Sequence, residues 1–285
     1  MTGAPHLTKG AVLRHAGWVT QRTVRGCAMK SLLTFVLLCS AGLFAQEPIP
    51  SGTVLPAQLR STLDSLKCKP GQTVTARIMQ DVPLSAPQQG HGWRLLETPS
   101  GPRIPAGAKV IGHIIDVAPA RGGMGPSITL RFDAVSFHGY TIPVTTNLRA
   151  LASMMEIEDA QVPPIGTDRG TPWAWMNTIQ IGGEAVYGQG GEVTHDSQVV
   201  GHYAPGGVLV RLSEKPGSSC RGAVAGNDRL QALWLFSSDA GGLYGFRDLE
   251  IAHAGRTAPL GRIILVSSSG RVHISAGSGL LLRVQ

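Results

Sequence analysis

Two close pairs of polar side chains have the types that acid–base or metal chemistry requires. His113 lies three residues before Asp116, and His195 directly precedes Asp196. An imidazole beside a carboxylate can transfer a proton or bind a metal ion. Isolated His residues at strand ends are usually just solvated, and the sequence has no His-Glu-x-x-His or Cys-x-x-Cys spacing. We therefore predict no catalytic residue, no metal and no cofactor.

An acidic cluster and a glycine-rich stretch are the next candidates. Glu156, Glu158 and Asp159 could serve as glycosidase carboxylates or calcium ligands. We interpret them instead as the polar face of a short helix. The glycines of 188–191 lack a dinucleotide fingerprint, because Val193 stands where its last Gly belongs. No Gly-x-Ser-x-Gly elbow occurs, so we predict a protein that is not an enzyme, with an unrecognised secreted hydrolase as the alternative.

Three aromatic residues could bind a ligand or a partner. Trp173 and Trp175 are two residues apart, hence on one face if that segment is extended. Together with Tyr187 they could stack on sugar rings, or pack over an open end of the fold. A carbohydrate- or ligand-binding module is therefore an alternative function.

Composition indicates the fold that must position these residues. Gly contributes 37 and Pro 19 of the 285 residues, roughly a fifth against about 12% on average, and charged residues are 15%. Turn residues between short apolar runs are typical of all-β proteins. We predict an all-β fold, a single β-barrel or sandwich-like domain with one short helix and long loops.

Periodicity places the strands of the first half. Alternating or β-branched apolar residues predict strands over 72–80, 108–117 and 128–137. His138-Gly139 reads as a hairpin turn, and Gly112 indicates a bulge or a close backbone approach. Residues 55–66 fit a strand or a helix equally well. A Pro-x-Gly sequence opens several of the apolar runs, typical of a turn that leads into a strand.

The second half is less regular. Leucine spacing predicts a helix over 147–159, and residues 160–203 are expected to be loop-rich. Further strands are predicted over 207–212, 232–238, 261–267, 271–276 and 279–284. Halves 49–149 and 204–285, joined by 150–203, are expected to form one domain, 46–285. The loops 85–103 and 160–203 would then be the contact elements.

The N-terminus carries most of the positive charge. Of the net charge of +7, five units lie in the first 45 residues, which contain no acidic residue. The rest of the chain has a net charge of +2 and no block of like charges, so we expect no nucleic-acid partner.

Residues 29–45 have the basic start, apolar centre and small residues of a signal peptide, with cleavage predicted after Ala45. An uncleaved anchor is the alternative. Residues 1–28 are predicted to be a disordered or mis-assigned extension.

Export determines how the cysteines are interpreted. Cys68 and Cys220 would belong to the mature chain, and an oxidising compartment favours a disulfide between them. Two separate thiols are the alternative. We expect a periplasmic or outer-membrane-associated protein, peripheral to the membrane at most.

Residues 49–145 resemble a known family in the order of their elements. Ile-Pro-x-Gly opens a strand at 49–52, Pro-Gly at 70–71 turns into a strand that ends Gln-Asp-Val, and a second Ile-Pro-x-Gly at 104–107 precedes an Ile-Gly. The paired segments RFDAV and YTIPV follow at 131–135 and 140–144. This order resembles the TrbI-like conjugal-transfer family, scaffold subunits of type IV secretion channels. The resemblance implies a β-barrel domain of the outer-membrane core without catalytic residues. Other envelope proteins or the chain itself, in a homo-oligomeric ring, would be its partners.

Overall fold

The computed structural model describes residues 49–85, 101–161, 179–184, 186–187, 192–195, 197–214 and 226–285, with the backbone alone at 179, 184, 186, 187 and 228. This part is mostly strand, with a single short helix, so the predicted all-β class is confirmed. No helix in these residues is long and apolar enough to span a bilayer. The predicted extension 1–28 and signal segment 29–45 lie outside the described residues.

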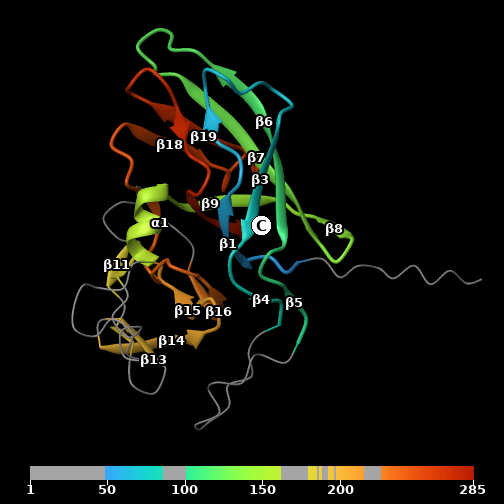
Figure 1. The fold of residues 1–285 in the computed structure, drawn as a ribbon, viewed down its shortest axis with the longest axis vertical. Coiled ribbons are helices and arrows are strands. Elements are labelled where there is room, and N and C mark those ends of the chain that lie inside the picture. Colours follow the sequence, from blue (N-terminus) through green and yellow to red (C-terminus); the bar gives the residue numbers. More distant parts are fainter. Residues whose placement is uncertain are drawn as a thin grey trace, which may run out of the picture. The chain divides into compact units, whose positions relative to one another are not determined.

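A strongly curved sheet of ten strands dominates the structure (Figure 1). Its order is β17 (Gly242–Tyr244), β9 (Thr146–Ala152), β21 (Gly279–Val284), β1 (Val54–Leu59), β3 (Thr73–Ile78), β6 (Lys109–Ala118), β7 (Ser127–Phe137), β19 (Ile263–Ser267) and β18 (Leu249–Ala254), with β8 (Tyr140–Pro143) paired to β7. Within the described residues no hydrogen-bonded ladder joins β17 to β18. The sheet is therefore open, and the fold is sandwich-like rather than a closed barrel.

A second sheet of five strands packs against part of the first. Its strands, in spatial order, are β12 (Val186–Tyr187), β13 (Glu192–His195), β14 (Gln198–Ala204), β15 (Gly207–Leu212) and β16 (Asn227–Ala232). Three small ladders complete the strands: β2 (Leu63–Asp64) with β20 (His273–Ile274), β4 (Val82–Pro83) with β5 (Arg103–Ile104), and β10 (Ile179–Gln180) with β11 (Gly183–Glu184). Helix α1 (Met154–Gln161) follows β9.

Three central strands separate two hydrophobic cores. In β1, β9 and β21, side chains on one face, such as Leu55, Leu148 and Leu280, join the core inside the large sheet. Side chains on the other face, such as Val54 and Leu281, join a second core beneath the five-stranded sheet. Burial on both faces explains why these strands are continuous apolar runs. Each fully buried side chain of this size contributes roughly 1.5–3 kcal/mol.

Local sequence accounts for the strands of the first half. In β3, Val74, Ala76 and Ile78 are buried while Thr73 and Arg77 are exposed, as the alternation predicts. Within the ambiguous range 55–66, residues 55–59 belong to β1 and residues 63–64 form β2, and none is helical.

The predicted turns are confirmed as well. In the turns before β1 and β6, Thr53 N–H donates to the Pro50 oxygen (3.2 Å) and Ala108 N–H to that of Pro105 (3.1 Å). Gly52 and Gly107 take the positive φ that such turns require.

Two further local predictions are confirmed in the hairpins that β7 forms with β6 and with β8. His138 and Gly139 both have positive φ, 50° and 80°, as in the type I′ turns that match strand twist. At Gly112 the ladder between β6 and β7 shifts register, which is the predicted bulge. A Cβ on Gly112 would overlap the backbone of Arg131, so the backbones approach too closely for a side chain.

The predicted helix over 147–159 is wrong in its first half. Residues 146–152 form β9, which is buried on both faces, and α1 begins only at Met154. The three-residue spacing of Leu148 and Leu151 reflects a bulge in β9. Leu148 pairs with Leu282 and Ala150 with Leu281, so Arg149 is the additional residue. The bulge directs both leucines into the same core, which imitates helical periodicity.

The predicted strand over 232–238 is also wrong, because β16 ends at Ala232. Trp234 is buried with φ of 53°, which is a turn conformation. Its N–H donates to Gln80 Oε1 (2.7 Å), and Gln80 Nε2 donates to the Val208 oxygen (3.0 Å). These two bonds of Gln80, which lies between β3 and β4, stabilise a turn in place of a strand. Residues 160–203, expected to be loop-rich, also contribute strands β10 to β13 and all but the last residue of β14.

Candidate functional site

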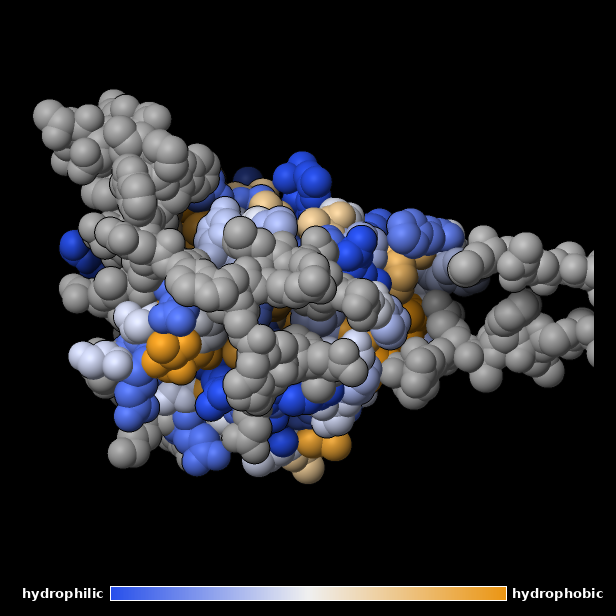
Figure 2. Space-filling view, turned by 90° about the horizontal axis from the view of Figure 1, so that it is seen from below, coloured by the Kyte–Doolittle hydropathy of each residue, from blue (hydrophilic) through white to orange (hydrophobic). Residues whose placement is uncertain are grey.

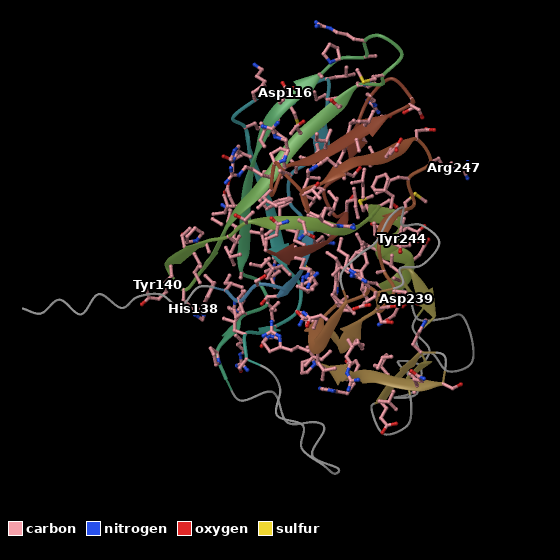
Figure 3. All side chains as sticks on the ribbon, turned by 180° about the vertical axis from the view of Figure 1, so that it is seen from behind. Asp116, His138, Tyr140, Asp239, Tyr244 and Arg247 are labelled. Carbon is pink, nitrogen blue, oxygen red and sulfur yellow. The ribbon has the colours of Figure 1, made fainter. Side chains whose placement is uncertain are left out.

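The first candidate polar pair, His113 with Asp116, forms no ion pair within the described residues. His113 lies on the outer face of β6, and its Nδ1 contacts Asp133 Oδ2 on β7 at 2.8 Å. Arg131 Nε shares that carboxylate at 3.3 Å. Asp116 is exposed near the far end of β6 (Figure 3). Cross-strand register, not sequence proximity, selects the partner of His113, and the result is a surface ion pair.

The second pair changes its partner too. His195 Nε2 lies 2.7 Å from Asp239 Oδ2, while the predicted partner Asp196 is outside the described residues. The two side chains are largely buried, 23% and 18% exposed. Asp239, labelled in Figure 3, lies in the turns between β16 and β17. This contact between His195 and Asp239 therefore links the five-stranded sheet to the segment that leads back to the large sheet.

A serine next to this pair invites comparison with a Ser-His-Asp triad. A Cβ placed on Gly183 would lie 2.9 Å from Ser237 Oγ and 4.0 Å from His195 Cε1, so the hydroxyl and the imidazole both lie close to Gly183. Ser237 is only 1% exposed, however. A nucleophile must reach its substrate, and this buried hydroxyl does not. The cluster is better suited to joining the two sheets than to acyl transfer.

The acidic cluster forms the polar side of α1. Ile157 and Ala160 are buried, whereas Glu158 and Asp159 are exposed and Glu156 is half-buried. Across the described residues, no three His, Cys, Asp or Glu side chains gather closely enough to hold a metal ion. The interpretation as a polar helix face is therefore the one that the geometry supports.

Several predicted site residues fall partly or wholly outside the described residues. Cys68 Sγ accepts a hydrogen bond from Asp64 N–H (3.3 Å), and its predicted disulfide partner Cys220 is not among the described residues. Trp173 and Trp175 are also outside them, and of Tyr187 only the backbone in β12 is described. The disulfide and the aromatic ligand site stay predictions. The contact loops 85–103 and 160–203 are described only in part.

The described interior leaves little room for a ligand. A residual cavity of about 10 Å³ lies among apolar side chains such as Leu59 and Phe132, which is the space of one water molecule at most. A groove of about 40 Å³ runs beside Gln80, Arg103 and Leu209. The interior of the large sheet is thus a packed core.

The exposed apolar side chains at the two ends of β7 were not predicted from the sequence. Met124, in the turn before β7, is 73% exposed, and Tyr140, just after the β7–β8 turn, is 62% exposed. Figure 3 shows His138 and Tyr140 at the end of a hairpin that projects from the sheet. We call Met124 and Tyr140 the tip residues. The glycines next to these residues predict the turns. The exposure of the two side chains, however, depends on how far the hairpins extend beyond the core.

The rest of the surface is mixed. On the face in Figure 2, hydrophobic residues occur in small groups among hydrophilic ones.

His202 on β14 is half-buried, and this burial lowers the pKa of its imidazole, so the neutral form is favoured.

No protein family model matches this chain, and neither a curated protein nor a solved structure matches it. The resemblance of residues 49–145 to TrbI-like domains therefore stays a prediction.

Proposed function

We propose that the protein is a non-catalytic, exported scaffold of the cell envelope that binds other proteins, beginning with copies of itself, as its resemblance to TrbI-like subunits implies. The observation that carries this proposal is the pair of tip residues. Large apolar side chains that project from a rigid sheet lose unfavourable contact with water when a partner covers them.

The scaffold behind the tips is well suited to present them. Strand β7, with eleven residues, is the longest strand in the described residues, and it pairs with β6, β8 and β19. Its core side chains Ile128, Leu130, Phe132 and Val135 are at most 2% exposed. Aromatic residues and Met are enriched at protein–protein interfaces, and a rigid support lowers the entropic cost of binding.

Light scattering over a concentration series of the full chain tests this proposal. We expect self-association in the micromolar range, weakened at least about tenfold in the double variant Met124→Ser/Tyr140→Ser. A matched control is Val199→Ser/Leu260→Ser, since these side chains are 54% and 61% exposed at other places. The control variant should associate like the original chain.

Two outcomes would overturn the proposal. One is a monomeric mass at every concentration, most clearly if the monomer bound a glycan array and lost that binding on Trp175→Ala. The other is hydrolysis of a chromogenic ester or glycoside by the purified chain with steady turnover.

A further inference from the structure

Three cations gather on the outer face of the large sheet, although they are far apart in the sequence. Register places Arg77 of β3 directly opposite Lys109 of β6, both exposed. Arg60, also exposed, follows β1, and its N–H donates to the Thr75 oxygen (2.8 Å). Half-buried Ile111 lies two residues beyond Lys109, hence on the same face. We call Arg60, Arg77 and Lys109 the cationic row.

The cationic row has no counter-charge in the described structure. Like charges placed directly opposite each other in a ladder are unfavourable. The carboxylates of neighbouring elements bind elsewhere: Asp133 contacts His113 and Arg131, and Asp81 contacts Arg103 at 3.4 Å. No ion pair among the described residues reaches any member of the row.

Helix α1 presents the opposite pattern. Met155, Glu158 and Asp159 follow the three- and four-residue spacing of one helix face, and all three are exposed. We call them the acidic helix face. Glu158 and Asp159 lie in the last turn, which contains no basic residue, and negative charge is unfavourable at a helix C-terminus. Neither carboxylate has an ion pair within the described residues.

The two surfaces complement each other in charge and in apolar centre. Carboxylates would meet guanidinium and ammonium groups, and Met155 would meet Ile111. They are separate on one molecule, because β21 and β1 stand between β9, which precedes α1, and β3 (Figure 1). Contact between copies would relieve the repulsion in the row and the poorly placed charges of the helix together.

We propose that the acidic helix face of one copy docks on the cationic row of the next, in a head-to-tail contact; this inference rests on the self-association proposed above. The occupant is a second copy of this chain. None of the exposed large apolar side chains belongs to β1, β3, β6 or β7, which disfavours insertion into a lipid surface. The described face also offers no exposed aromatic platform for nucleic-acid bases.

Charge-swap complementation in the full chain tests the contact. Arg77→Glu/Lys109→Glu and Glu158→Lys/Asp159→Lys should each weaken self-association at least about tenfold, because like charges then face each other. An equimolar mixture of the two variants should associate again, as should the chain with all four changes. Association of the original chain should weaken between about 50 and 500 mM salt.

A matched control variant makes the same change of charge at exposed arginines outside the cationic row. Arg211→Glu/Arg262→Glu alters two exposed cations outside the row and should associate like the original chain. Circular dichroism must show that every variant is folded, and renewed association in the mixture excludes misfolding as the cause of a loss.

The docking contact is overturned, while the scaffold proposal stands, if the original chain associates and neither variant weakens that association. It is also overturned if the mixture of the two variants fails to associate. A strictly monomeric original chain overturns the scaffold proposal itself. Binding to anionic vesicles or DNA that the row variant abolishes, without any effect on self-association, would overturn the assigned partner.

Discussion

Arg149 shows how one buried cation joins distant segments. It is the bulge residue of β9, is 2% exposed, and donates to the oxygens of Ala240 (2.9 Å), Ser213 (2.8 Å) and Ser238 (3.3 Å). A buried carbonyl that loses its donor costs free energy, and hydrogen bonds to charged groups are among the stronger ones. The guanidinium therefore connects β9 to the segments after β15 and β16.

We predict that Arg149→Met lowers the free energy of unfolding by at least about 3 kcal/mol, because it leaves several buried oxygens without a donor. Arg211→Met is the control, since Arg211 is exposed on β15, and it should change stability by no more than about 0.5 kcal/mol. Urea denaturation measures both. Equal effects of the two variants would show that the Arg149 bonds contribute nothing to stability.

Asp64 gives a pH-dependent prediction. The Leu66 N–H donates to Asp64 Oδ1 (3.0 Å) and holds the pKa of this carboxyl below its ordinary value of 3.8; burial opposes this, and Arg271 and Lys67 assist it. A lowered pKa in the folded state stabilises the fold above about pH 4, and this contribution is lost as the pH falls through the folded-state pKa. The stability difference between the original chain and Asp64→Asn should therefore be largest at neutral pH and shrink in acid. Urea midpoints from pH 7 down to pH 3 measure it, and a difference that is independent of pH would contradict the assignment.

At the scale of elements, the β6–β7 hairpin depends on a glycine that allows close backbone contact. We predict that Gly112→Ala destabilises the protein by at least about 2 kcal/mol, because a Cβ would overlap the backbone of Arg131. Gly122→Ala in the same hairpin is the control: that site has a φ of 58° but open space around it, so only about 1 kcal/mol is expected. Thermal unfolding compares them. A larger loss at Gly122 would show that backbone conformation, not close approach, is the constraint.

At the scale of the whole molecule, the shared strands β1, β9 and β21 should make the two cores unfold together. Leu265 belongs to the core inside the large sheet and Leu233 to the core beneath the five-stranded sheet. We predict that Leu265→Ala and Leu233→Ala each cost about 2–5 kcal/mol and shift one common transition. Far-UV circular dichroism should coincide with fluorescence, to which buried Trp234 contributes. Two resolved transitions would mean that the cores are independent.

The sequence by itself determined what depends on local physics. The alternation in β3, the type I′ turn at His138-Gly139 and the bulge at Gly112 follow from side-chain periodicity and allowed φ values, which act over a few residues. The all-β class of the fold follows from the same side-chain periodicity and turn residues.

Tertiary structure alone decided the rest. The bulge at Arg149 produces a leucine spacing like that of a helix, and the turn at Trp234 depends on Gln80 from the distant connection between β3 and β4. The partners of His113 and His195 come from strands or turns remote in sequence. The cationic row, scattered along the chain, becomes one surface only through strand register. These features arise from contacts between distant segments, whose geometry no local pattern encodes.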